Sequence, residues 1–170
     1  SDLQEERYVE YVDLLTKLQN IYEVDLYDLL NLSVDRRGGL DSYLAELGDL
    51  IKRGDAALTA VEANLVDLDA QYQVLTTQAE QYETDFFGFV EANYGRAAHD
   101  TLNLFVETSQ EAVAIKAKFN SENVLRTGFI NILNLLRPRY EDVTANTEAL
   151  IKGVKIFDVP GSNIDAIVPF

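Results

Sequence analysis

The 170-residue sequence contains no cysteine, methionine or tryptophan, and it has a single histidine. Without cysteine the chain can form neither disulfides nor thiolate metal sites, and it has no thiol nucleophile. One histidine cannot supply the two Glu-x-x-His pairs of a di-metal carboxylate site in a helical bundle. Because even an initiator methionine is absent, we expect the chain to be a processed protein or a fragment of a longer one.

Basic residues are also scarce, and they are unevenly placed. The formal net charge is −15, and no Lys or Arg occurs between Gly54 and Tyr94. An acidic surface of this kind repels phosphate backbones and anionic lipids, so we expect no nucleic-acid partner. It is typical either of a solvated face that aids solubility or of a surface that attracts cationic proteins or divalent ions.

Long apolar runs are missing as well. No run approaches the roughly 18 residues that indicate a membrane span. The charged, amphipathic start of the sequence does not resemble a signal peptide. We therefore expect any membrane tether to lie outside this sequence. Localisation stays open, and an extracytoplasmic domain of a membrane-anchored protein is one interpretation.

A helical pattern of apolar residues fills the centre of the chain. From Leu44 to Phe89, apolar or aromatic residues recur in alternating steps of three and four over more than six heptads. Residues 65–75 also alternate as a strand would, with Asp67 and Asp69 on one face as in a metal-binding pair. That alternation lasts only nine residues and has no turn signals, so the helix is favoured. On a helix the two aspartates lie about 200° apart and cannot chelate one ion.

The predicted fold class is all-α. The only prolines are Pro138, Pro160 and Pro169, and the pairs Gly38-Gly39 and Tyr94-Gly95 are expected helix stops. We expect an elongated antiparallel helical bundle or coiled coil of three to four long helices. The last two segments are either separate or joined in one helix kinked at Pro138. The predicted segments are 3–31, 42–93, 97–119 and 122–157, in a single domain over 1–157, followed by a turn and an apolar tail over 158–170.

The apolar positions that recur from Leu44 to Phe89 form one stripe of the predicted 42–93 helix, which we call the main seam. A second stripe of mostly small residues lies on the opposite face of this helix. We interpret it in two ways. Contact with another helix would sandwich the 42–93 helix between neighbours, whereas alanine on an exposed face would simply favour helix formation. The burial of Asp67 separates these interpretations. The stripe consists of Ala56, Ala60, Ala63, Asp67, Ala70, Val74 and Thr77.

The unequal helix lengths predict a two-helix hairpin. The 3–31 helix is long enough to cover only the 42–70 half of its neighbour, so residues 71–93 would pair mainly with 97–119. A chain break near Asn120 would give a compact four-helix bundle instead. Aromatic residues crowd the expected tip around 86–99, where they either close a small core or form an exposed patch that marks a binding site. The candidate interaction residues are Phe86, Phe87, Phe89, Val90 and Tyr94.

Three polar features have structural interpretations. Arg36-Arg37 and the pair Arg137/Arg139 are expected to flank helix C-terminal ends, where cations complement the helix dipole. A docking site for an acidic partner is the alternative for both clusters. His99 is interpreted as a helix-start residue near a turn.

The sequence contains no motif that carries a defined reaction. It has no glycine-rich phosphate loop, no EF-hand loop and no G-x-S-x-G nucleophile motif. We therefore expect no catalytic residues, cofactor or metal, and the sequence indicates no small-molecule substrate.

The function expected from these features is a non-catalytic scaffold or protein-protein interaction domain. Its partner would be another protein or a second copy of the chain. The alternative is a ligand-sensing helical bundle domain of a membrane receptor. This alternative requires a polar cavity between helices, formed by Asn131, Asn134, Arg137, Arg139 and Asn146.

Overall fold

The computed structural model describes residues 3–23, 25–32 and 35–153, and these residues form helices and turns without any strand. The prediction of an all-α fold is confirmed. The predicted tail over 158–170, and the end of the predicted last helix, lie outside the described residues. The helices are α1 (Leu3–Glu23), α2 (Leu26–Leu32), α3 (Arg36–Glu91), α4 (Gly95–Ala145) and α5 (Thr147–Ile151).

The prediction of one helix over 3–31 is wrong, because Asp25 starts a new helix. The backbone N–H groups of Tyr27 and Asp28 donate to Asp25 Oδ1 at 2.9 and 3.2 Å. Asp25 is therefore the N-cap of α2, and its carboxylate satisfies two of the donors that a helix start leaves unpaired. The apolar spacing continues through this point, so it conceals the boundary.

The prediction of a helix stop at Gly38-Gly39 is also wrong, since α3 already begins at Arg36. Both glycines lie in its first turn, and the Gly39 N–H donates to the Asp35 carbonyl at 3.0 Å. A Cβ on Gly38 would lie 2.6 Å from Asp35 Oδ2. The glycine leaves room for this carboxylate at the helix start, where negative charge is favourable.

The predicted segments 97–119 and 122–157 are one helix over Gly95–Ala145, with Pro138 inside it, followed by the short α5. The alternative of joined segments is confirmed over this range, and the four-helix arrangement with a break near Asn120 is wrong. Arg137 and Arg139 lie within α4 rather than at its end. Arg36 opens α3, but its guanidinium donates to the carbonyl of Ile151, the last residue of α5, at 3.1 Å.

The chain divides into two compact units. Unit 1 contains residues 1–61 and 124–170, so it includes α1, α2, α5 and one end each of α3 and α4. Unit 2 contains residues 62–123, so it consists of the remaining parts of α3 and α4 and the turn between them. Unit 2 is thus the predicted two-helix hairpin, although it begins earlier than residue 71.

Unit 1 holds the largest of the fully buried side chains in the described part of the chain. In α3, Tyr43, Leu50 and Ala57 are buried together with Leu47 and Val61 of the predicted seam, whereas the seam residues Leu44, Ile51 and Leu58 are half-buried. Both α1 and α4 contact this segment through ion pairs. Arg53 of α3 forms ion pairs with Glu10 and Asp13 of α1, and Arg137 of α4 pairs with Asp55 of α3. The largest of the fully buried side chains are Tyr11, Leu14, Leu18, Leu26, Leu30, Leu40, Leu47, Leu50, Leu125, Phe129, Ile132 and Leu136.

The Arg53 ion pairs should make the stability of unit 1 depend on acidity. Asp13 Oδ1 accepts from Lys17 Nζ at 2.8 Å and Asp13 Oδ2 from Arg53 Nη2 at 2.6 Å, and the two hydrogen bonds lower the pKa of Asp13. A carboxylate whose pKa is lower in the folded state stabilises the fold above its unfolded pKa of about 4 and loses this effect as the pH falls further. Urea unfolding between pH 7 and 3 should therefore show a steeper loss of stability for the unmodified chain than for Asp13→Asn. Asp49→Asn, an exposed change on α3 that leaves these ion pairs intact, should keep the original pH dependence.

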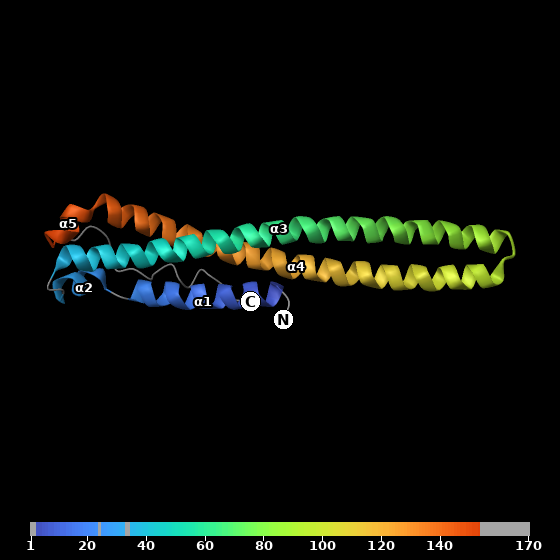
Figure 1. Cartoon of the computed structure of the whole chain (residues 1–170), viewed down its shortest axis with the longest axis horizontal. Coiled ribbons are helices and arrows are strands. Elements are labelled where there is room, and N and C mark those ends of the chain that lie inside the picture. The colour runs from blue at the N-terminus through green and yellow to red at the C-terminus, as the bar shows by residue number, and fades with distance from the viewer. Residues whose placement is uncertain (1–2, 24, 33–34, 154–170) are drawn as a thin grey trace. The chain divides into compact units, whose positions relative to one another are not determined.

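In unit 2, α3 and α4 run antiparallel and side by side (Figure 1). The helical period predicted for residues 65–75 is confirmed, and the seam of α4 follows the same three-four spacing. Most buried positions in the unit 2 part of α4 carry small residues such as Ala98, Thr101 and Ala112, and Glu122 is the large exception, whereas rings such as Tyr72 and Phe105 are half-buried. Two helices can cover only one face of each other, so much of the seam borders solvent.

The predicted sandwich through the second stripe is wrong. Ala60, Ala63, Asp67 and Ala70 are all exposed. The described residues of unit 2 form only two helical segments, so no third helix of unit 2 lies against Ala63, Asp67 and Ala70. The alternative interpretation, alanine favouring helix formation on an exposed face, accounts for these positions.

Candidate interaction surface of the hairpin

The turn between α3 and α4 is a Schellman motif, in which two backbone hydrogen bonds close the end of a helix. The N–H of Tyr94 donates to the carbonyl of Phe89 at 2.9 Å, and the N–H of Asn93 donates to that of Val90 at 3.2 Å. Asn93 has a φ of 61°, so the left-handed residue is Asn93 and not Gly95, which is the first residue of α4. The Phe89 and Tyr94 rings lie 6.5 Å apart and supply the hydrophobic contact that accompanies this motif.

The five predicted tip residues fall into two groups. Phe86 and Phe89 are half-buried on the seam. Phe87, Val90 and Tyr94 are 59%, 49% and 63% exposed. The rings of Phe86 and Phe87 meet edge to face at 5.4 Å. The tip therefore has two half-buried rings on the seam and three exposed side chains beside it. We call the three exposed side chains, Phe87, Val90 and Tyr94, the tip patch.

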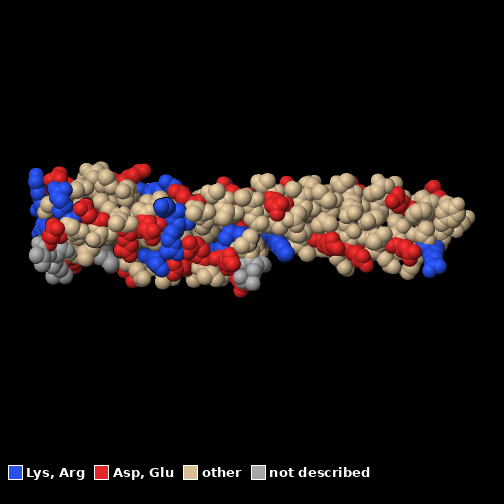
Figure 2. Space-filling view, viewed as in Figure 1, with Lys and Arg blue, Asp and Glu red and all other residues tan. Residues whose placement is uncertain are grey.

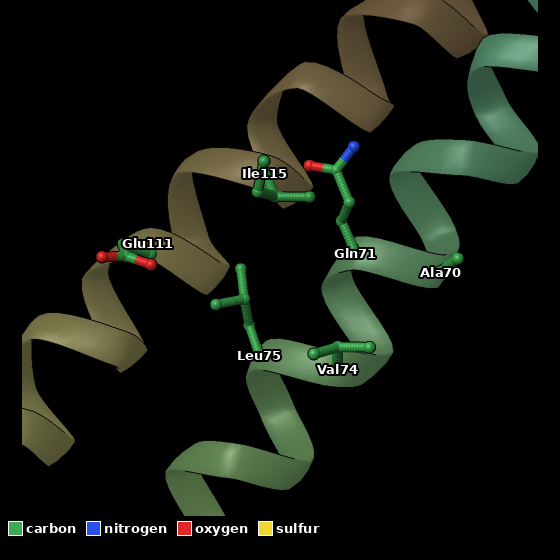
Figure 3. A pocket seen from close by; sticks show the side chains of 6 residues that line it. All are labelled: Ala70, Gln71, Val74, Leu75, Glu111 and Ile115. Carbon is green, nitrogen blue, oxygen red and sulfur yellow. The ribbon is translucent and has the colours of Figure 1, made fainter.

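A groove runs between α3 and α4 in the middle of unit 2. It encloses about 530 Å³ and is lined by Ala70, Gln71, Val74, Leu75, Glu111 and Ile115. Figure 3 shows Gln71, Leu75 and Ile115 reaching into the space between the two helices. Val74 is 66% exposed, and the Gln71 amide donates to Asp67 Oδ2 at 3.0 Å. The groove is mostly apolar, with one carboxylate at its edge.

Lys116 stabilises the seam beside this groove. Its ammonium lies 5.3 Å from the centre of the Tyr72 ring and 4.8 Å from that of Phe119. Each such cation–π contact contributes about 0.5–1 kcal/mol at an exposed site. At 100° per residue, Lys116 lies on the opposite side of the seam from Glu111. Its charge is therefore directed away from the groove.

The charge of unit 2 is strongly negative. Residues 62–123 carry eleven acidic and three basic residues, a net charge of −8, and the α3 segment within them has no basic residue at all. The three basic residues are Arg96, Lys116 and Lys118. Figure 2 shows that the visible face of unit 2 has few lysine or arginine side chains, which gather instead on unit 1.

Neither a cluster of metal-binding side chains nor a membrane-spanning helix is found among the described residues. No group of three or more His, Asp or Glu side chains is placed to hold a metal ion in the described part of the chain. His99 is exposed in the second turn of α4, in agreement with its interpretation as a helix-start residue. Among the described helices, none is both long enough and apolar enough to span a bilayer.

The residues expected around a ligand cavity do not line either of the cavities described here. Arg137 pairs with Asp55, Arg139 lies over the Tyr22 ring at 5.1 Å, and Asn146 donates to the Asp142 carbonyl. A cavity of about 360 Å³ in unit 1 has another lining, which is Asn20, Ile21, Leu29, Gly39, Ser42, Tyr43 and Glu46. The ligand-sensing function stays a prediction.

Comparisons of the sequence with protein families, with curated proteins and with solved structures give no match. The inferences about function therefore rest on the geometry and charge of the two units. The tip patch was among the residues predicted from sequence, but the groove was not. The one visible signal of the groove was the second stripe, where one of the two interpretations placed Ala70 and Val74 against another helix of the same chain.

Proposed function

We propose that the chain is a non-catalytic protein-interaction module and that unit 2 contacts a protein partner through its tip patch. The exposure of Phe87, Val90 and Tyr94 carries this proposal. Phe86 and Phe89 already occupy the seam, so the three outward side chains are not needed to close it. Large apolar side chains clustered on a surface are typical of binding sites.

The turn geometry supports this role because it holds the tip patch in a defined position. The two hydrogen bonds of the Schellman motif fix the backbone on both sides of Asn93. Tyr94 is tied to Phe89 by ring contact. Aromatic side chains that are already ordered lose little conformational entropy on binding, and Tyr and Trp are enriched at the energetic centres of interfaces.

A partner of different sequence fits unit 2 better than a second copy does. Two copies of unit 2 would each carry a net charge of −8 over residues 62–123. Like charges brought together across an interface cost several kcal/mol, whereas opposite charges speed association and favour the correct partner. The scaffold function proposed here therefore requires a protein other than the chain itself.

The experiment compares Phe87→Ser with Phe89→Ser, two neighbouring phenylalanines of which only the first is mostly exposed. We expect Phe87→Ser to leave the melting temperature nearly unchanged and to abolish cross-linked capture of a specific partner. Phe89→Ser should instead lower the free energy of unfolding by about 1–2 kcal/mol, because it removes part of the seam. Sedimentation velocity on each variant gives the state of self-association.

Val66→Ser is the matched control, because Val66 is exposed on the same helix far from the tip. It should retain the partner that Phe87→Ser loses. The tip proposal is wrong if Phe87→Ser and Val66→Ser capture the same proteins in the same amounts. It is also wrong if the exposed tip instead drives self-association that Phe87→Ser disrupts.

A further inference from the structure

We propose that the groove between α3 and α4 of unit 2 binds a cationic amphipathic helix from a partner protein, forming a three-helix arrangement. This inference rests on the proposed interaction function and names the class of partner. It concerns the groove and not the tip patch, so the two sites can be tested separately.

The shape of the groove fits a helix. Its α3 side presents Ala70 and Val74, and Gln71 and Leu75, each pair spaced by four residues and so aligned along the helix axis. Ile115 of α4 borders the opposite side (Figure 3). A groove between two antiparallel helices accepts the apolar face of a third, whose side chains at i, i+3, i+4 and i+7 enter it. The small Ala70 side chain would let that third helix approach closely.

The charge around the groove selects a basic partner. Glu111 lines the groove, is exposed, and has no ion-pair partner among the described residues. Asp67 lies one turn from Gln71 on α3 and is exposed. Of the nearby cations, Lys116 faces the other side of the seam and Lys118 already has a contact of its own. Lysine or arginine residues flanking an apolar stripe would therefore meet carboxylates on both sides of the groove.

The test uses a synthetic helix of about 18 residues, or five turns, with leucine on one stripe, lysine elsewhere and a single tryptophan. The protein has no tryptophan, so the emission of the peptide reports binding directly. We expect this peptide to bind. A peptide with glutamate in place of lysine should not bind, and neither should a lysine peptide with shuffled leucines.

Val74→Lys is the decisive variant, and Val113→Lys is its matched control. Both valines are highly exposed in unit 2, at 66% and 70%, but only Val74 lines the groove. The two substitutions change the net charge equally, and neither removes a buried group. We expect Val74→Lys to raise the dissociation constant of the lysine peptide about tenfold or more, and Val113→Lys to change it less than about threefold.

Three results would overturn the groove inference. The first is no binding of the lysine peptide, or equal binding of the glutamate peptide. The second is equal weakening by Val74→Lys and Val113→Lys, which would indicate a general charge effect. The third is loss of binding in Phe87→Ser but not in Val74→Lys, which would place the peptide on the tip and leave the proposed function standing. A failure of the tip experiment alone would leave the groove result unaffected.

Discussion

Replacing Asn120 with proline should lower the free energy of unfolding by about 3 kcal/mol or more. Asn120 lies in the interior of α4, and its side chain is exposed, so the substitution removes no buried contact. Proline would delete the backbone hydrogen bond to the carbonyl of Lys116 and press its ring against that carbonyl. The turn that would be distorted carries Lys116 and Phe119, and the Lys116 ammonium lies over the rings of both Phe119 and Tyr72 of α3.

Asn120→Ala is the control for this substitution. It changes the same exposed side chain but keeps the backbone hydrogen bond, so it should raise stability by a few tenths of a kcal/mol through helix propensity. Urea unfolding followed by circular dichroism measures both variants. If Asn120→Pro cost less than about 1 kcal/mol, a break near this residue would have to be present in the native chain, and the separate helices 97–119 and 122–157 would be restored.

The continuity of α4 could not be decided from sequence, because the residues at Asn120-Ser121 and at Pro138 both favour a helix end. Asn120-Ser121 is a polar pair of poor helix formers, and Pro138 usually ends a helix or starts a new one. The apolar spacing that carries α4 past both points runs on its other face from Phe119 through Phe129 to Leu136 and Val143. The free energy of this packing exceeds the propensity cost of Asn120 and Ser121, a few tenths of a kcal/mol each, and it also offsets the cost of about 3 kcal/mol that Pro138 imposes inside α4.

The helix ends were predicted less well than the helices, for a related reason. Asp25 interrupts an apolar pattern that continues on both sides, and a cap contributes only about 1 kcal/mol. Gly38-Gly39 fits a helix stop by composition, yet it opens α3. Arg36, in the first turn of α3, donates a hydrogen bond from its guanidinium to the carbonyl of Ile151 in α5. A contact between residues so far apart in sequence leaves no local pattern.

The candidate surface was partly predictable from spacing. Phe86 and Phe89 fall on the heptad seam and Phe87 and Val90 fall beside it, so counting alone separates half-buried from exposed residues at the tip. The groove was not predictable in this way. It depends on which residues of α4 lie beside Ala70 and Val74, and the spacing within each helix does not determine how the two helices are aligned with each other.

Replacing Gly128 with alanine should lower the free energy of unfolding by about 1–3 kcal/mol, although alanine is the better helix former. A Cβ at this position would lie 2.5 Å from Cε2 and 3.0 Å from Cδ2 of Tyr11. Tyr11 is fully buried, and its ring packs edge to face on Phe129 at 5.7 Å. Because neighbours surround the ring, it cannot shift far enough to admit a methyl group without disturbing the core of unit 1.

Gly88→Ala is the matched control, because Gly88 lies in α3, is exposed, and has no atom within 4 Å of the added Cβ. It should raise stability by up to about 1 kcal/mol through the loss of backbone freedom in the unfolded chain. Thermal and urea unfolding should show a lower free energy of unfolding for Gly128→Ala and a higher one for Gly88→Ala. In a Tyr11→Leu background, the penalty of Gly128→Ala should shrink, because the two positions are coupled through the same space. If Gly128→Ala stabilised the chain as Gly88→Ala does, this face of α4 could not pack against Tyr11, and the arrangement of α1 and α4 in unit 1 would be wrong.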